Sequence, residues 1–224
     1  MICISIMAHD NHDALKKMAE AAPLADILEI RLDVMETFDL KEIVKFAPRP
    51  VIATYRSKKE GGKGADDYGT RVRYLLDATK ARADFVDVEY TLPLAYRSQV
   101  FQARGVSKII LSTHLLYETP PKERLEAILR KMAAAGPDIV KIVTQAKKPE
   151  DNLRILALIP VAKELDIKII AFCMGRLGRV SRIATTPLGG YLTFASLATG
   201  QESASGQIPA GKMKKILETL FYKY

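Results

Sequence analysis

The sequence predicts a single (β/α)8 barrel that spans residues 1–224, and two observations support this prediction. Short runs rich in β-branched residues alternate with longer stretches in which apolar residues recur at helical spacing. Strands that alternate with helices imply a parallel sheet, and eight such units in 224 residues imply a closed barrel. An open, doubly wound sheet would place glycines after its first strand, where MICISIMAHDNHD has none.

The expected strands are short apolar runs, and the segments between them have the spacing of helices. The clearest helix is expected over 120–135, where apolar residues recur at every third or fourth position from Leu125 to Ala133. Two prolines suit its start and Gly136 suits its end, while the last helix is expected over 209–222. The eight expected strands cover residues 2–7, 27–34, 50–56, 85–90, 107–114, 138–144, 167–174 and 191–197.

The composition is that of a globular protein with a basic surface. Hydrophobic residues make up 48% of the chain and charged residues 27%, proportions that exclude disorder as the main state. Against 26 Asp and Glu stand 34 Lys and Arg, a net charge of +8. The basic residues are interleaved with acids along the whole chain, so we expect a solvated basic surface and no nucleic-acid partner.

Cysteine usage and hydropathy indicate where the protein works. Cys3 and Cys173 lie in apolar runs and are expected to be buried, reduced thiols, which suits a cytoplasmic protein. No apolar run approaches the ~18 residues that a membrane span needs. The first residues, MICISIM, have no basic leader, so we expect neither a signal peptide nor a membrane partner.

Charged side chains interrupt several of the expected strands. Strands of a parallel barrel are buried on both faces, and an unpaired charge there costs several kcal/mol. Alternation places Glu29, Arg31 and Asp33 on one face of their strand, and Asp87 and Glu89 on one face of theirs. Two interpretations remain open: ion pairs that only fix the strand register, or an active site at the carboxyl end of the barrel.

Two polar residues in strands suggest a particular chemistry. Lys141 lies between Val140 and Ile142, in a run from which a lysine rarely reaches water, and an amine nucleophile is the natural interpretation. His114 ends the fifth expected strand; it could be a buried structural histidine, but its titration range suits general acid–base catalysis. The chain has 3 histidines and none is spaced from an acid as metal ligands are, so no metal site is expected.

Three loops that follow expected strands are rich in small or basic residues. Residues 60–64 (EGGKG) and 199–209 (TGQESASGQIP) are small and polar enough to act as lids. Residues 174–182 (MGRLGRVSR) combine glycine and arginine at a helix start, which suits an anion. The GxxxxGK[ST] pattern of a P-loop is absent from the sequence.

In their order along the chain, these motifs resemble the type I 3-dehydroquinate dehydratases, a family of Schiff-base-forming (β/α)8 barrels of the shikimate pathway. The resemblance runs from Ser5 to Gln207. Departures are small: Thr113 and Leu115 flank the histidine, and Ser205 stands where the family often has proline. The motifs are EIRLD at 29–33, STH at 112–114, DIVKIV at 138–143, MGRLGRVSR at 174–182 and SASGQI at 203–208.

The resemblance implies roles for individual residues. Lys141 would form an imine with the ketone of 3-dehydroquinate, and His114 would be the general acid–base. Glu60, four residues after Arg56 as in the family's R-x-x-x-E, would orient His114. Arg182 would clamp the substrate carboxylate. The other implied ligands are Ser5, Glu29, Arg31 and Arg56 at the substrate, with Ser203 and Gln207 in a lid.

The same resemblance implies partners and leaves alternatives. A 3-dehydroquinate dehydratase of this kind needs no organic cofactor or metal, because the lysine supplies the electron sink, and the family is commonly homodimeric. The first alternative is a class I Schiff-base aldolase that uses Lys141 on a sugar phosphate. The second, a basic nucleic-acid-binding protein without enzymatic activity, leaves a lysine inside a strand unexplained.

Overall fold

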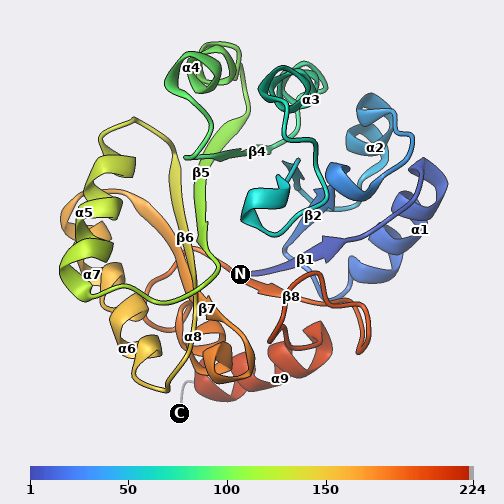
Figure 1. The fold of residues 1–224 in the computed structure, drawn as a ribbon. Helices are drawn as coiled ribbons and strands as arrows, with labels where there is room; N and C mark the ends of the chain where they lie inside the picture. Colours follow the sequence, from blue (N-terminus) through green and yellow to red (C-terminus); the bar gives the residue numbers. More distant parts are fainter. Residues whose placement is uncertain (222–224) are drawn as a thin grey trace.

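The computed structural model describes residues 1–221, and its centre is a barrel of eight parallel strands (Figure 1). Each strand overlaps one that the sequence predicts, so the predicted (β/α)8 barrel is confirmed. The strands lie in the order β7-β6-β5-β4-β3-β2-β1-β8. They are β1 (Ile2–Ile6), β2 (Ile27–Arg31), β3 (Val51–Thr54), β4 (Phe85–Glu89), β5 (Lys108–Leu115), β6 (Ile139–Gln145), β7 (Lys168–Met174) and β8 (Thr193–Ala195).

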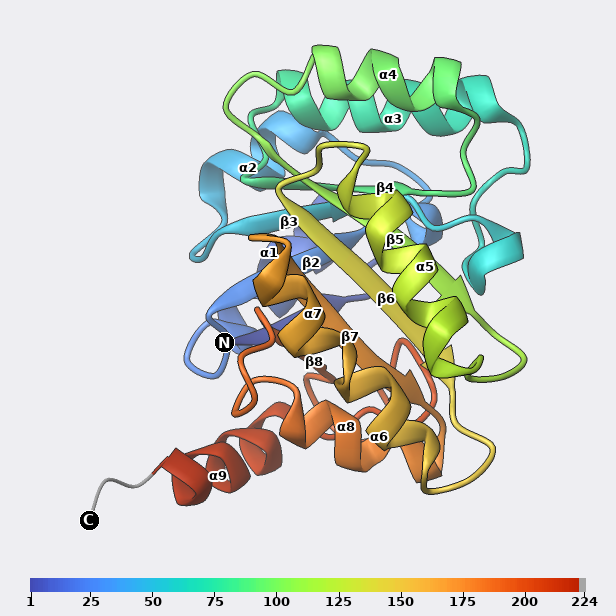
Figure 2. The same cartoon turned by 90° about the vertical axis from the view of Figure 1, so that its left-hand side faces the viewer.

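The helices surround the barrel and bury one face each against it (Figures 1 and 2). The helix expected over 120–135 runs from Lys122 to Ala133, after the prolines. The last helix ends at Phe221; the expected end at residue 222 lies outside the described residues. The helices are α1 (Asn11–Ala21), α2 (Leu40–Phe46), α3 (Tyr68–Lys80), α4 (Leu94–Gln102), α5 (Lys122–Ala133), α6 (Asp151–Leu156), α7 (Leu158–Glu164), α8 (Arg179–Ala184) and α9 (Ala210–Phe221).

The barrel is nearly closed, with its weakest seam between the first and last strands of the order. In residues 1–221, seven parallel pairings join neighbouring strands, but β7 and β8 share no ladder. The Tyr191 N–H donates a 2.7 Å hydrogen bond to the Ile169 carbonyl across this seam. The rings of Phe172 and Phe194 also meet there, with centroids 6.0 Å apart. Backbone and ring contacts therefore complete the cylinder where strand pairing stops.

Five of the expected strands, β1, β2, β3, β4 and β8, end one to three residues earlier than the sequence predicts, and the early ends of β2 and β3 affect the site. Residues 32–34 form a 3-10 turn rather than the end of β2, and β3 stops at Thr54. Asp33 is therefore past the strand, where its carboxylate accepts from Nε and Nη2 of Arg31 at 2.8 Å each. The early ends place Asp33 and Arg56 past their strands, at the mouth of the barrel, and make Arg31 the last residue of β2.

The barrel interior changes from apolar to polar along the strands. Side chains of one buried apolar cluster fill the end where the strands begin, and the cluster extends along β6, β7 and β8 toward the other end. Because side chains alternate along a strand, the residue two positions further on also points inward. On six of the strands that residue is polar, so a polar layer covers an apolar one. The apolar layer includes Cys3, Ile27, Ile52, Phe85, Ile110 and Ile139; the polar layer above it contains Ser5, Glu29, Thr54, Asp87, Ser112 and Lys141.

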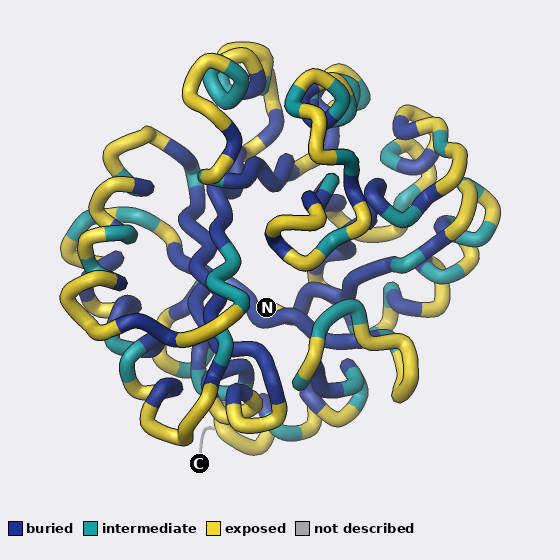
Figure 3. Tube along the Cα trace, in the orientation of Figure 1, coloured by how far each residue is buried: buried dark blue, intermediate teal, exposed yellow. Residues whose placement is uncertain are grey.

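Figure 3 shows the strands buried along most of their length and the outer surfaces of the helices exposed. Three aspartates fix the amino ends of three strands: Asp26, Asp84 and Asp138 each accept from a backbone N–H at the start of the preceding strand, at 2.7 to 2.9 Å.

Among the helices of residues 1–221, none combines the length and the apolar character that a membrane span requires.

Truncating the apolar layer should weaken the whole fold. Ile110 is fully buried in this layer, and we expect Ile110→Ala to lower the free energy of unfolding by about 2–5 kcal/mol. Val106 is 64% exposed, so Val106→Ala should change it by less than about 0.5 kcal/mol. Urea denaturation followed by circular dichroism measures both, and equal losses would show that the layer does not support the barrel.

Candidate active site

A cavity opens at the carboxyl end of the barrel, and most of the residues predicted for the site line it. Its empty volume is about 380 Å³, part of it open solvent. Val143, Phe172, Met174 and Phe194 form an apolar wall. The predicted residues that line it are Ser5, Glu29, Arg31, Arg56, His114, Lys141, Arg182, Ser203 and Gln207; Glu60 lies behind His114 and is bonded to it.

Lys141 extends from β6 into the cavity between two carboxylates. Its ammonium nitrogen lies 3.1 Å from Oδ2 of Asp87 and 3.7 Å from Oε1 of Glu29. It also lies 4.2 Å from the centre of the Phe194 ring. The side chain is only 5% exposed, so the amine can reach a molecule in the cavity but little bulk water.

Glu29 is held on both oxygens by hydroxyl groups of the neighbouring strands. The Ser5 hydroxyl donates to Oε2 at 2.6 Å and the Thr54 hydroxyl to Oε1 at 2.9 Å. Burial on its own would raise the pKa of Glu29, but Lys141 and Arg31 outweigh it and the pKa is lowered. Glu29 therefore stays ionised beside the amine.

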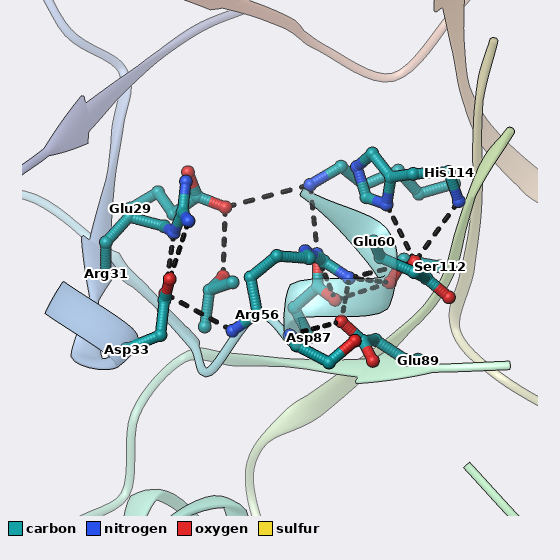
Figure 4. Close-up of polar contacts among 12 residues, drawn as sticks. Glu29, Arg31, Asp33, Arg56, Glu60, Asp87, Glu89, Ser112 and His114 are labelled. Carbon is teal, nitrogen blue, oxygen red and sulfur yellow. Dashed lines mark hydrogen bonds and ion pairs between the residues drawn. The ribbon is translucent and has the colours of Figure 1, made fainter. Parts of the chain in front are cut away.

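His114 and Glu60 form a pair at the mouth of the barrel (Figure 4). Oε2 of Glu60 lies 2.9 Å from Nδ1 of His114 and 3.1 Å from its backbone nitrogen, and the Thr91 hydroxyl donates to Oε1 at 2.8 Å. Burial lowers the pKa of His114 well below its ordinary value, and Arg56 and Lys141 lower it further. A neutral imidazole that donates from Nδ1 to a carboxylate has its Nε2 lone pair free for a proton.

Glu60 reaches this position because the loop after β3 is fixed to the barrel. The Gly62 and Gly64 N–H groups donate to Ser57 and Arg56 carbonyls at 2.8 and 2.9 Å, and the Lys63 N–H donates to Asp33 at 3.0 Å. A side chain at position 62 would begin 2.2 Å from the Arg56 carbonyl oxygen, so glycine is required. The segment 60–64, expected as a lid, is therefore an anchored support in this structure.

The Arg56 guanidinium connects four side chains of this end of the barrel (Figure 4). Nη2 donates to Asp87 at 2.8 Å, and Nη1 contacts the Ser112 hydroxyl at 3.0 Å, Glu89 at 3.1 Å and Glu60 at 3.3 Å. Burial opposes its charge, but the three carboxylates outweigh burial and raise the pKa of Arg56. In return, Arg56 and Lys141 lower the pKa of Asp87 against the effect of burial.

Arg182, on α8, is the cation with the fewest partners in the cavity. The side chain is 1% exposed, its guanidinium lies 4.5 Å from the Phe172 ring centre, and Nη2 donates to the Ser205 carbonyl at 3.3 Å. Among the described residues, Nε has no hydrogen-bond partner. Burial lowers the pKa of Arg182 to about 10. A buried guanidinium with free donors is suited to an anion from the cavity.

The segment 199–209 lies over the cavity as a cover. Ser203 and Gln207 bond each other twice, through the Ser203 N–H at 2.8 Å and the Gln207 amide at 3.0 Å. Gly206, at φ +80°, packs so closely on Gly175 that a Cβ atom would lie 2.2 Å from its carbonyl oxygen. These contacts hold both predicted lid residues against the cavity.

Comparison with known proteins identifies the family. The Type I 3-dehydroquinase family matches residues 2–223. The chain belongs to the type I 3-dehydroquinase family. A 3-dehydroquinate dehydratase of Methanococcus maripaludis strain C5 is 37% identical over 98% of this chain and 100% of that protein, and that of Methanocaldococcus jannaschii 34% over 96% and 97%. The family and the class of enzyme that the sequence motifs predict are thus confirmed.

Solved structures agree with this membership of the type I 3-dehydroquinase family. A Clostridium difficile type I 3-dehydroquinate dehydratase with covalent modified comenic acid has a TM-score of 0.87 and 26% identity, over 98% of this chain and 91% of that one. A 3-hexulose-6-phosphate synthase of Salmonella typhimurium reaches 0.63 at 15% identity, over 97% and 98%. The second likeness shows only the fold, so the sugar-phosphate aldolase alternative is not favoured.

In this member of the type I 3-dehydroquinase family, the structure adds residues whose part in the site the sequence does not predict. Asp87 and Glu89 were noticeable as acids in a strand, and the structure shows that they bind Lys141 and Arg56. Arg71 was missed, because an arginine on a helix usually faces solvent. It lies buried on α3 and forms an ion pair with Glu89.

Removing the charge of Asp87 should weaken the fold strongly. We expect Asp87→Asn to lower the free energy of unfolding by about 3–5 kcal/mol, because it leaves Arg56 and Lys141 buried without this counter-charge. The matched control is Asp77→Asn, which breaks an exposed 3.2 Å pair with Lys80 and should cost less than about 1 kcal/mol. Urea denaturation measures both free energies of unfolding. An Asp87→Asn protein as stable as the control would show that Asp87 is not a necessary counter-charge for Arg56 and Lys141.

Proposed function

We propose that this protein dehydrates 3-dehydroquinate to 3-dehydroshikimate, a step of the shikimate pathway, through an imine formed on Lys141. The observation that supports this most is the place of the amine: Lys141 extends into a cavity that Arg182 and the His114–Glu60 pair also reach. A nucleophile, a base and an anion-binding guanidinium thus face one small volume. The dehydratases among the relatives act on this substrate by name.

In the first step, the Lys141 amine attacks the C3 ketone of 3-dehydroquinate. The carbinolamine that forms loses water and leaves an iminium linked to Nζ. Asp87 and Glu29, at 3.1 and 3.7 Å from Nζ, are placed to stabilise that positive charge. The apolar wall that includes Phe194 limits the water around it.

In the second step, His114 removes the proton from C2, which the iminium has made acidic. The electron pair of that C–H bond becomes the new double bond, and the C1 hydroxyl leaves as water after taking a proton from His114. β5 and β6 pair Ser112 with Lys141, so His114 stands two residues, about 7 Å, nearer the mouth. A six-membered ring can occupy this interval. Hydrolysis of the imine then releases the product and restores the lysine.

The remaining predicted residues bind and cover the ring. Arg182 would hold the substrate carboxylate, since its guanidinium has free donors and faces the cavity. Glu29, Arg31 and Arg56 would bind the ring hydroxyls with Ser5, and these groups are already fixed by their own pairs. Ser203 and Gln207 would close over the bound ring from the cover at 199–209.

The chemistry of this scheme needs neither an organic cofactor nor a metal, because the imine itself draws electrons from C2. We further propose a homodimer, on the family resemblance, and a cytoplasmic location, on the two buried free thiols of Cys3 and Cys173. Sedimentation of the purified protein and fractionation of cells test these two proposals.

Trapping the imine tests the proposed reaction directly. Borohydride added during turnover of 3-dehydroquinate should reduce the iminium to a stable amine, and peptide mass mapping should locate the adduct on Lys141. Lys141→Ala should abolish both adduct and turnover, while the exposed control Lys163→Ala should keep both. Turnover without any adduct would refute the covalent mechanism, and an untouched substrate would refute the activity.

The low pKa of His114 predicts the pH dependence of the reaction. The base must be neutral, and burial with Arg56 and Lys141 lowers the pKa of His114 below 6.5, so kcat/KM should stay level as the pH falls through 6.5 and decline only beneath it. This decline of kcat/KM at low pH is the acid limb of the pH profile, and rates measured between about pH 5 and about pH 9 show its midpoint. A midpoint at about 7 or higher would contradict a neutral, desolvated base.

A further inference from the structure

Arg71 is a buried arginine that the proposed reaction does not use. It lies in the first turns of α3, outside the barrel wall, and is 4% exposed. Nη2 contacts Oε2 of Glu89, at the carboxyl end of β4. Arg73, two residues further along the same helix, is exposed. The helix therefore directs one of these arginines toward the site and the other into solvent.

Glu89 and Glu60 share one nitrogen of Arg56. Nη1 lies 3.1 Å from Oε1 of Glu89 and 3.3 Å from Oε2 of Glu60, and it also contacts the Ser112 hydroxyl at 3.0 Å. A guanidinium NH2 group has two hydrogens for these three oxygens. Glu89 and Glu60 therefore compete for the hydrogens of Nη1, and another cation bound to Glu89 makes this competition weaker.

We propose that Arg71 is a positioning residue for His114, because it gives Glu89 a second cation, so that Arg56, which Glu89 and Glu60 share, can hold Glu60 as the ionised partner of the histidine. Arg71 occupies the oxygen of Glu89 that points away from Arg56. The consequence of this role of Arg71 for catalysis rests on the proposed function, in which His114 is the base. Arg71 itself does not line the cavity.

The charges around Glu60 explain why one distant cation matters. Three carboxylates share Arg56, and each has a second partner: Lys141 for Asp87, Arg71 for Glu89, and His114 for Glu60. Only the partner of Glu60 is neutral, because the pKa of His114 is lowered. Burial raises the pKa of Glu60 despite Arg56, whereas the pKa of Asp87 is lowered, so Glu60 is closer than Asp87 to taking up a proton. The groups that face it are Arg56 after β3, Asp87 and Glu89 on β4, Thr91 after β4, His114 on β5, Lys141 on β6 and, through Glu89, Arg71 on α3.

Loss of Arg71 should therefore move the acid limb of the reaction. In Arg71→Met, the cluster has one positive charge fewer, and the Glu60–His114 pair takes up its proton at higher pH. We expect kcat/KM to fall about tenfold on the acid side of the limb and by less than about twofold above neutrality. Arg71→Lys keeps the charge and should keep the wild-type limb. Arg73→Met removes a charge from the same helix at the surface and should also leave the limb unmoved.

Variants of Glu89 separate charge balance from a structural role. Glu89→Gln alone removes a negative charge and should move the limb to lower pH, and adding Arg71→Met should return it toward the wild-type position. This pair of variants tests the proposal even where Arg71→Met alone does not fold. An equal loss of kcat/KM at all pH values, or a limb that stays in place in every variant, would overturn it.

A measurement without substrate keeps this test independent of the proposed reaction. The chain has 3 histidines, so the ring of His114 can be followed by proton NMR and assigned by its absence in His114→Ala. Its titration should shift to higher pH in Arg71→Met and stay in place in Arg73→Met. A wild-type enzyme that leaves 3-dehydroquinate untouched would refute the proposed function alone. An unmoved His114 titration in a folded Arg71→Met protein would refute the role of Arg71.

Discussion

The buried guanidinium of Arg56 is the group on which the rest of the site depends. It joins Asp87 and Glu89 on β4 to Ser112 on β5 and to Glu60 in the turn after β3. Each of these acids is almost fully buried, and none could stay ionised there without a cation. The cation in turn needs its acids, since burial on its own lowers the pKa of Arg56 and disfavours its charge. The cluster therefore forms as a unit or not at all, which fixes the ends of three strands relative to one another.

The barrel makes such a cluster possible because hydrophobic packing and the ionisable groups of the site lie at different heights along its axis. The apolar layer, from Cys3 to Ile139, fills the cylinder with side chains that need no partners and supplies hydrophobic stabilisation. The polar layer lies two residues further on, where the same inward-facing positions have ionisable groups. The hydrophobic stabilisation of the apolar layer offsets the free energy that desolvation of these ionisable groups costs. Lys141 stands at this boundary, with apolar residues on one side and carboxylates on the other.

The sequence predicts the parts of this arrangement that depend on local pattern. Eight β-branched runs set the strands, and charges within those runs, such as Glu29 and Lys141, mark the inward positions near the mouth. Contacts between distant segments are harder to predict. The burial of Arg71 depends on how α3 packs against β4, and the support role of 60–64 depends on backbone bonds back to Ser57 and Arg56. Neither leaves a periodic signal, because an arginine on a helix and a glycine-rich loop both resemble solvated surface.

Burial acts in opposite directions on the two members of the catalytic pair. It penalises charge on either group, so it raises the pKa of Glu60 and lowers the pKa of His114. The pKa values of the carboxylic acid and the imidazolium therefore lie closer together than in water. Moving a proton from a charged His114 to Glu60 along their 2.9 Å contact then costs less than it would in water. The positive charge of Arg56 lowers the pKa of both groups, so it favours the ionised carboxylate of Glu60 and the neutral form of His114. The proton on the pair therefore stays on Nδ1 of the histidine, and Nε2 remains free to accept the next one.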